Sequence, residues 1–200
     1  MANRNTVGFG LIPTGTVGAT PATAGQGKYF IDAAYDKDLF QGTVVQSKVG
    51  YIKAAEATRT LLTIGILNGI FYNAATTLKP TFDNKYIQPI TPANSEDITA
   101  FVIDNPMQLF VGCLNGAAAQ ADYGRTVSMT AADPSGSSTS GQSNKKLDDG
   151  NIHDTNNQFR LLRSAEDPEN DENAANRSVV VCQNLNQYMQ NTGTAGITWQ

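Results

Sequence analysis

The sequence has few charged side chains. They make up 16% of its 200 residues, against about a quarter in typical soluble domains. The net charge is −4 and no cluster of Lys and Arg is present. Proteins that bind nucleic acid rely on such clusters to contact phosphates. The composition therefore predicts no nucleic-acid partner.

Residues that carry common catalytic chemistry are also scarce. His153 is the only histidine and lies in the polar segment 148–158, where a solvated loop position is expected. No nucleophile with an adjacent base is indicated. The serine-rich segment 136–141 lacks the G-x-S-x-G spacing, and no phosphate-binding G-x-x-x-x-G-K-[ST] loop occurs. We expect no enzyme, no catalytic residue and no cofactor, although carboxylates distant in sequence could still meet in space.

Cysteines and long apolar runs are few. Cys113 and Cys182 each lie in an apolar run, which predicts buried free thiols, with a disulfide between neighbouring strands as the alternative. No run approaches the roughly 18 apolar residues of a membrane helix, and residues 1–28 lack the pattern of a signal peptide. We therefore expect a protein made in the cytoplasm that has no membrane partner.

The sequence does contain many short strand-like segments separated by Gly, Pro and Asn turns. Asn68-Gly69 is typical of a two-residue hairpin turn, and a strand with a bulge is the alternative. Segments 99–103 and 108–113 are expected to form a strand pair. We predict an all-β fold, either a compact β-barrel or a β-sandwich of about ten short strands. The expected strands lie at 29–31, 42–46, 51–53, 61–73, 99–103, 108–113, 159–163 and 178–182.

The first 27 residues are rich in Gly, Thr, Ala and Pro and cannot bury enough surface to fold alone. We predict an extended N-terminal arm over 1–27. A single β-rich domain would follow over 28–200, with a low-complexity loop at 133–144 and a short C-terminal tail. The arm is more apolar than a free tail needs, which favours contact with a partner surface over plain disorder. The candidate contact residues are Val7, Phe9, Leu11 and Ile12.

Segment 166–172 places five carboxylates within seven residues. Calcium takes six to eight oxygen ligands, and Asp167, Asn170 and Asp171 could supply some of them. The EF-hand pattern does not fit, because Glu172 stands where Gly is required. These three residues are a weak candidate calcium loop, and a solvated connection between strands is the expected structure.

Several segments, in their order along the chain, resemble the β-rich head decoration, or cement, proteins of tailed bacteriophages, particularly marine ones. The similarity covers roughly residues 60–197, and the order of the motifs carries it. Two departures are visible: Asn105 replaces the second acidic residue of a "DDP" turn, and Gln187 stands where the family often has histidine. The main segments are TIGILNGIFYN (63–73), ITAFVIDNPMQLFVGCLNG (98–116), SGQSNKKLDDG (140–150) and FRLLRSAEDPEN (159–170).

The resemblance implies a structural virion protein, made in the host cytoplasm, that binds the outer surface of the capsid. Such a protein bridges capsomers and stabilises the head against the pressure of packaged DNA. Its partner would be the major capsid protein, and it would be a homotrimer at threefold positions. Many copies would sum modest contacts, and the arm could add strands to the shell or fill its grooves.

Other functions remain open at this point. The chain could be a virion surface binding module, either for glycans or as a calcium-dependent β-sandwich. It could also be a structural protein associated with the tail. An enzyme such as a polysaccharide hydrolase would require a buried carboxylate pair in a cleft.

Overall fold

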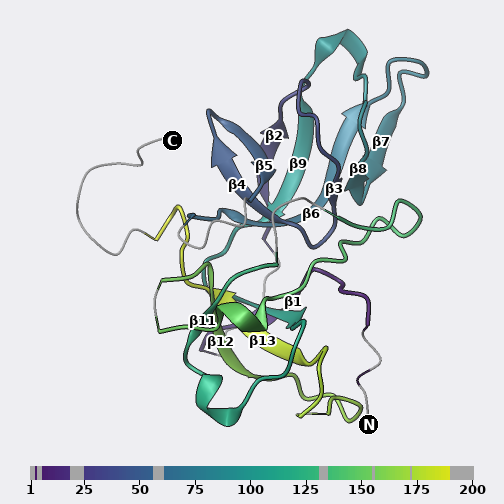
Figure 1. Ribbon diagram of the computed structural model, residues 1–200. Coiled ribbons are helices and arrows are strands. Elements are labelled where there is room, and N and C mark those ends of the chain that lie inside the picture. Colours follow the sequence, from purple (N-terminus) through teal and green to yellow (C-terminus); the bar gives the residue numbers. More distant parts are fainter. Residues whose placement is uncertain are drawn as a thin grey trace.

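The computed structural model describes residues 3, 6–18, 25–55, 61–130, 135–154, 156–171 and 173–189 (Figure 1). These residues form antiparallel strands and three single 3₁₀ turns, so the predicted all-β class is confirmed. None of these turns is long and apolar enough to cross a membrane. The elements are β1 (Leu11–Thr16), β2 (Gly27–Ile31), β3 (Leu39–Phe40), β4 (Val44–Lys48), β5 (Tyr51–Ala54), β6 (Gly65–Asn73), β7 (Pro80–Asp83), β8 (Lys85–Tyr86), η1 (Ala93–Ser95), β9 (Ile98–Ile103), β10 (Gln108–Cys113), η2 (Gln120–Asp122), β11 (Thr126–Val127), η3 (Asp149–Asn151), β12 (Phe159–Ser164) and β13 (Ser178–Gln183).

The strands form two main sheets and one short ladder. Sheet A has the order β1-β10-β13-β12-β11, and sheet B has the order β2-β9-β6-β4-β5, with β7 also paired to β6. β3 pairs with β8. Sheet B curls until its edge strands β2 and β5 touch, but no ladder joins them in the described chain. The two sheets are thus open, and a closed barrel is not formed.

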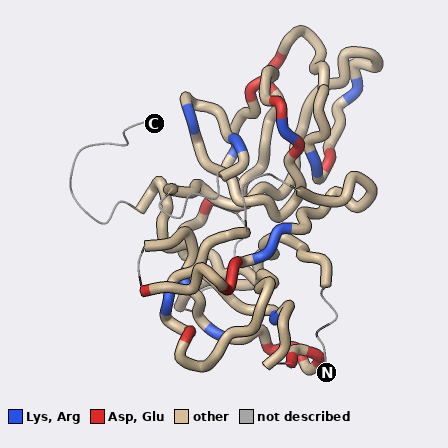
Figure 2. The backbone as a smooth tube through the Cα atoms, in the orientation of Figure 1, with Lys and Arg blue, Asp and Glu red and all other residues tan. Residues whose placement is uncertain are grey.

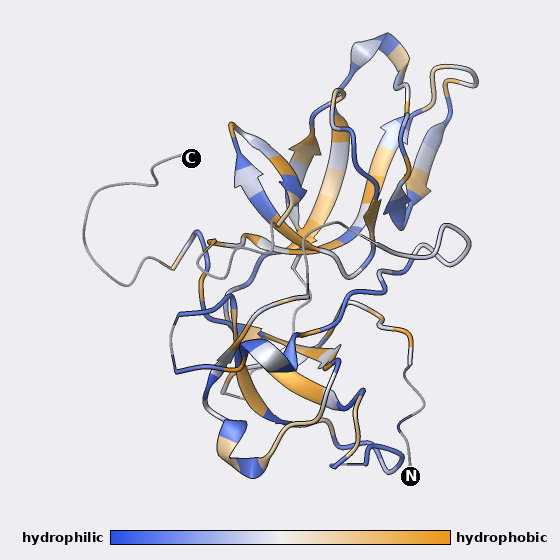
Figure 3. Ribbon diagram, viewed as in Figure 1, coloured by the Kyte–Doolittle hydropathy of each residue, from blue (hydrophilic) through white to orange (hydrophobic). Residues whose placement is uncertain are grey.

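The two sheets pack against each other through one of two hydrophobic clusters, and the other cluster lies inside sheet B. Three strands of sheet B have apolar residues on both faces, because successive side chains of a strand point to opposite sides. One face packs with sheet A in the first core cluster, through Val44, Ile66 and Ile103. The other face forms the second cluster inside sheet B, with Val45, Leu67 and Val102. Figure 3 shows the hydrophobic residues concentrated in the strands of both sheets.

The segment around Asn68-Gly69 is a continuous strand with a bulge. β6 runs through both residues, and its register against β9 shifts between Leu67 and Gly69. Neither Asn68 nor Gly69 has the positive φ that a type I′ turn requires. The hairpin expectation is therefore wrong, and the bulge alternative is confirmed.

The expected pairing of 99–103 with 108–113 is also wrong. Both segments are strands, but β9 lies in sheet B between β2 and β6, whereas β10 lies in sheet A between β1 and β13. The connection bends at Asn105, whose carbonyl oxygen accepts a hydrogen bond from the amide of Gln108 (3.0 Å). Both strands are central in their own sheets, so neither has an edge left for the other.

Part of the predicted N-terminal arm belongs to the folded domain. Leu11–Thr16 forms β1, which pairs with β10 at one edge of sheet A. Leu11 is 1% exposed and belongs to the core. Gly10, with φ of +70°, lets the chain approach the carbonyl oxygen of Gly42, which a Cβ would meet at 2.6 Å. The boundary between residues 27 and 28 is therefore wrong, because β1 is integral to sheet A and β2 already begins at Gly27.

The predicted low-complexity loop is described from residue 135 onward, and residues 133–134 lie outside the described part. Its described portion is closed by a bridge between Gly136 and Ser143. The predicted C-terminal tail falls beyond residue 189 and also lies outside the described residues.

Candidate binding surfaces

The acidic loop between β12 and β13 is organised by Asn170, whose side chain turns inward. Its amide nitrogen donates to the carbonyl oxygens of Ser178 (2.8 Å) and Ala165 (3.2 Å) and to Ser164 Oγ (3.0 Å). Its Oδ1 accepts a hydrogen bond from the amide of Ser178 (3.0 Å). Both ends of this amide therefore tie the loop to the strands.

The carboxylates of the same loop cap their own turns. Asp167 Oδ1 accepts from the amide of Glu169 (3.0 Å), and Asp171 Oδ1 accepts from that of Asn173 (3.0 Å). Within the described ranges, no three His, Cys, Asp or Glu side chains gather as a metal site would require. Glu172 lies outside those ranges. The structure therefore uses the three candidate calcium ligands within the loop itself.

The acidic loop instead holds a residue from the N-terminal segment. Asn3 is 4% exposed, and its amide nitrogen donates to the carbonyl oxygens of Asp171 (3.0 Å) and Ala175 (3.1 Å). Its Oδ1 accepts from the amide of Asp171 (2.6 Å). This contact joins residues that are 168 positions apart, which no local sequence pattern indicates.

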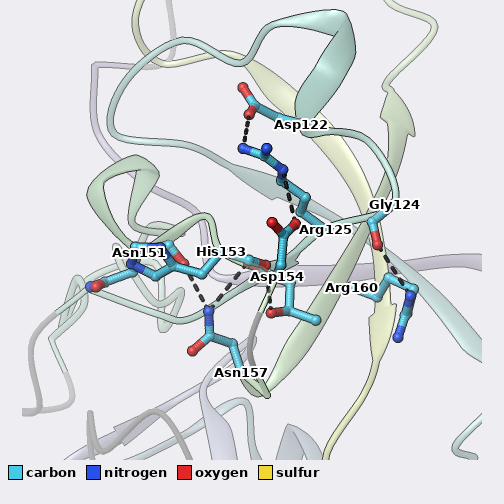
Figure 4. A network of polar contacts seen from close by, with 9 residues as sticks. Asp122, Gly124, Arg125, Asn151, His153, Asp154, Asn157 and Arg160 are labelled. Atoms are coloured by element: carbon cyan, nitrogen blue, oxygen red, sulfur yellow. Dashed lines mark hydrogen bonds and ion pairs between the residues drawn. The ribbon is translucent and has the colours of Figure 1, made fainter.

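The loop that carries His153 is held by backbone and surface contacts (Figure 4). The backbone of His153 exchanges two hydrogen bonds with Thr126, each 2.9 Å long. Beside it, Arg125 Nε forms an ion pair with Asp154 (3.1 Å), whose side chain is 81% exposed. The buried Asn157 donates to the carbonyl oxygen of Asn151 (2.8 Å). These contacts stabilise the loop.

The two cysteines are free thiols, as predicted, although only Cys113 is fully buried. In the ladder of β10 with β13, Cys113 lies opposite Ser178 and Cys182 lies opposite Leu109. The two thiols are thus at opposite ends of the paired strands and do not form a disulfide. Burial raises the pKa of both thiols.

The four candidate contact residues of the arm do not act together. Leu11 is part of the core, so it is unavailable to a partner. Phe9 is half-buried and lines a small cavity of about 110 Å³ between β1 and β6, together with Ile12. Val7 is 68% exposed and Ile12 is 41% exposed. Only Val7 and Ile12 present substantial apolar surface.

Ile12 belongs to an apolar patch on the outer side of sheet A, which we call the aliphatic face. Ile12 lies opposite Val111, and Leu109 lies opposite Cys182. Leu109 and Val111 are two residues apart and therefore point to the same side, away from the buried Phe110. These residues are half-buried or exposed. The aliphatic face consists of Ile12, Leu109, Val111 and Cys182 around Val180, which lies opposite Val111 and is 2% exposed.

The edge of sheet A beside this face is protected against strand addition. Pro13 has no amide hydrogen to donate, and the register of β1 shifts between Pro13 and Gly15. Proline and bulges are common devices that block pairing at sheet edges. A partner at this edge would therefore contact side chains rather than extend the sheet.

A second apolar patch covers the outer side of sheet B, and we call it the phenylalanine face. It consists of Phe30, Phe71, Phe82 and Phe101. Phe30 and Phe71 both lie opposite Thr99, Phe71 lies opposite Phe82, and Phe101 follows Thr99 by two residues. All four rings therefore share one side. Phe82 is 73% exposed, yet its ring centroid lies 4.7 Å from that of Phe71 and 6.4 Å from that of Phe101.

The phenylalanine face contains an open groove of about 500 Å³. Gly69 forms its floor, because it lies opposite Phe101 on the neighbouring strand and has no side chain to fill the space. Polar side chains complete the lining: Gln26, Asn68, Asp83 and Asn84. Sequence reasoning missed this groove, because β7 with Phe82 was not among the expected strands and alternation does not show that the other three phenylalanines share an exposed face.

Charge is spread thinly over both sheets. Figure 2 shows most Lys and Arg as separate short segments, whereas several Asp and Glu lie together near the N-terminus. The two apolar faces are therefore the most distinctive surfaces of the described molecule.

Comparisons with known proteins identify no relative. No family model, curated protein or solved structure matches the chain.

Proposed function

We propose that the chain is a structural protein of a phage virion that binds the outer surface of the capsid and bridges its subunits. The aliphatic face carries this proposal, together with the order of motifs along the chain. Antiparallel sheets commonly turn one face to the core and a polar face to water. Here the outer side of sheet A also carries a row of apolar side chains, bordered by Arg160 and Arg163 of β12, and apolar patches on a surface mark contact sites.

The aliphatic face suits contact with a shell made of repeated subunits. Its residues are held by the ladders β1-β10 and β10-β13, so little ordering is needed when a partner binds. Each contact can be weak, because many copies on one particle sum their effects. The partner in this proposal is the major capsid protein. A homotrimer would present three aliphatic faces at a threefold position.

Removing residues 2–24 would also remove β1 and the core residue Leu11, so single surface substitutions test the proposal more sharply. We expect Ile12→Lys and Ile12→Glu each to weaken binding to heads that lack the protein by about tenfold, since a charge at an apolar contact is left unpaired. The use of both signs separates loss of apolar contact from an effect of charge. Val49→Lys is the matched control, because Val49 is 74% exposed on the hairpin of sheet B.

Occupancy is measured by co-sedimentation with heads, with the folding of each variant checked by its melting temperature. Binding that is unchanged in both Ile12 variants would remove the aliphatic face from the proposal. Finding the protein on isolated tails and not on heads would instead favour a tail-associated role. Light scattering of the free protein tests for the trimer.

A further inference from the structure

The groove on the phenylalanine face combines exposed ring surface with polar groups that have unused hydrogen-bonding capacity. Asn68 Oδ1 accepts from Gln41 (2.9 Å), while the Asn68 amide nitrogen donates to no acceptor in the described chain. Asn84 has the opposite arrangement: its amide nitrogen donates to the carbonyl oxygen of Ser140 (2.8 Å), which leaves its Oδ1 as an acceptor. Asn68 and Asn84 both line the groove, and between them they leave one donor and one acceptor without a partner in the described chain.

Asp83 adds a second acceptor at the same place. Its Oδ1 accepts from the amide of Lys85 (3.2 Å) and lies 4.0 Å from the Lys85 ammonium. Its other oxygen has no partner in the described residues. Among the described residues, Asp83 is the only ionised side chain that lines the groove, and the nearest cations are Lys85 and Lys28, whose ammonium lies 5.5 Å from the centre of the Phe30 ring. The Asp83 carboxylate disfavours an anionic group at that point of the groove, whereas a neutral ligand with hydroxyl groups could donate to it.

The rings are already positioned before any ligand binds. Phe82 and Phe101 lie on either side of Gly69, with an angle of 17° between their planes. Phe71 supports Phe82 from the adjacent strand. Gly69 also cannot be replaced freely, because a Cβ there would come within 2.9 Å of the carbonyl oxygen of Asp83. Glycine at position 69 therefore permits the close approach of the Asp83 backbone beside the rings.

We propose that this groove binds a neutral carbohydrate. Sugar rings present apolar C–H faces that can lie on the phenylalanine rings, and their hydroxyl groups both donate and accept. The groove supplies the matching set through Asn68, Asp83 and Asn84. Its volume of about 500 Å³ lies within the usual range of ligand sites, roughly 300–1,000 Å³.

A second copy of the chain fits the groove less well. Stable protein interfaces bury about 800 Å² per partner and exclude charged residues from their centre. Here a carboxylate and two asparagines lie directly beside the most exposed ring. The groove is on sheet B and the aliphatic face is on sheet A, so this inference does not depend on the proposed capsid contact.

The test titrates the full-length protein with neutral hexasaccharides. The panel contains fragments of starch, cellulose, xylan, mannan and chitin, each six sugar units long. Oligogalacturonate serves as an anionic comparison. Binding is measured by calorimetry and by saturation-transfer NMR. We expect at least one neutral probe to bind with a Kd of about 1 mM or tighter and oligogalacturonate to bind more weakly.

Two variants assign that binding to the groove. Phe82→Ala should weaken it by about tenfold, since it removes the exposed stacking surface. Asp83→Asn should also weaken it, because a charged acceptor becomes neutral. Leu78→Ala is the control and should bind as the original does, because Leu78 is 70% exposed in the connection between β6 and β7 and does not line the groove.

Three outcomes would overturn the proposal. They are no binding to any neutral probe, binding that survives Phe82→Ala unchanged, and tighter binding of oligogalacturonate than of the neutral hexamers. A fall in molecular mass on Phe82→Ala, measured by light scattering, would assign the face to self-association instead. None of these measurements uses phage heads, so a negative result in the head-binding test would not change the conclusion about the groove.

Discussion

At the scale of single residues, the structure assigns most of the polar side chains of the acidic loop to holding the loop in place. Asn170 spans the gap between the strands that flank it, while Asp167 and Asp171 accept amides within two residues of themselves. Asn170, whose donor and acceptor atoms both have partners in the protein, has little left to offer a cation.

The loop should therefore be sensitive to Asn170→Asp and insensitive to calcium. The substitution keeps the shape of the side chain but replaces a donating NH₂ group with an acceptor facing two carbonyl oxygens. We expect the free energy of unfolding in urea to fall by about 2 kcal/mol. Asn173→Asp, at an exposed position of the same loop, should change it by less than about 0.5 kcal/mol.

Calcium distinguishes the two interpretations of this loop. The melting temperatures of the original protein and of Asn170→Asp should be the same in excess CaCl₂ and in EDTA. A calcium site would be strengthened by an added carboxylate, and ligand well above its Kd would raise the melting temperature by mass action. A rise with calcium in either protein would contradict our interpretation.

At the scale of elements, the positions of the turns do not always match the residue types that favour turns. The only hairpin with positive φ at two consecutive residues in the described chain joins β4 to β5, at Val49 (54°) and Gly50 (85°). This is the backbone of a type I′ turn, which favours Asn-Gly. The chain's own Asn68-Gly69 instead lies within β6, because the ladders to β9 and β7 extend that strand on both sides.

The β4–β5 hairpin is therefore strained at Val49. A β-branched residue at positive φ costs about 1–2 kcal/mol, and the exposed side chain makes little compensating contact. Val49→Asn should raise the free energy of unfolding by about 1 kcal/mol, measured in urea. Gly50→Ala, which introduces the same kind of strain at the next residue, should lower it. Equal or lower stability of Val49→Asn would contradict the assignment of the turn.

At the scale of the whole molecule, the two sheets are coupled because neighbouring residues of β9 pack into different clusters. Ile103 lies in the cluster shared with sheet A, and Val102 lies in the cluster inside sheet B. Loss of one cluster must therefore disturb the strand that supports the other. This arrangement favours unfolding as a single unit.

We expect one transition in urea, coincident by far-UV and near-UV circular dichroism. Ile103→Ala and Val102→Ala should each shift that whole transition, by about 2–4 kcal/mol for Ile103→Ala and by less for the smaller valine. Two separated transitions, each moved by only one of the variants, would show that the sheets fold independently.

Alkaline pH should destabilise the whole molecule. Burial raises the pKa of the phenols of Tyr35 and Tyr86 and of the thiols of Cys113 and Cys182. The unfolded chain therefore releases these protons at lower pH than the folded chain, and the free energy of unfolding falls as pH rises past the ordinary values of about 8.5 to 10. Urea midpoints should hold steady from about pH 7 to 8 and decrease above about pH 9. A midpoint that stays constant to about pH 11 would contradict this.

The sequence by itself determined the all-β class, most strand positions and the free thiols. These features depend on local properties, such as alternation with period two, turn-forming residues and the scarcity of cysteine. The pairing of β1 with β10, the separation of β9 from β10 and the inward turn of Asn170 were decided only by the tertiary structure. Alternation defines two faces of a strand but does not say which one is buried. The partners that settle this, such as Leu11 for sheet A or Phe82 for Phe101, come from other strands that lie apart along the chain. The two apolar faces are visible only after those partners are in place.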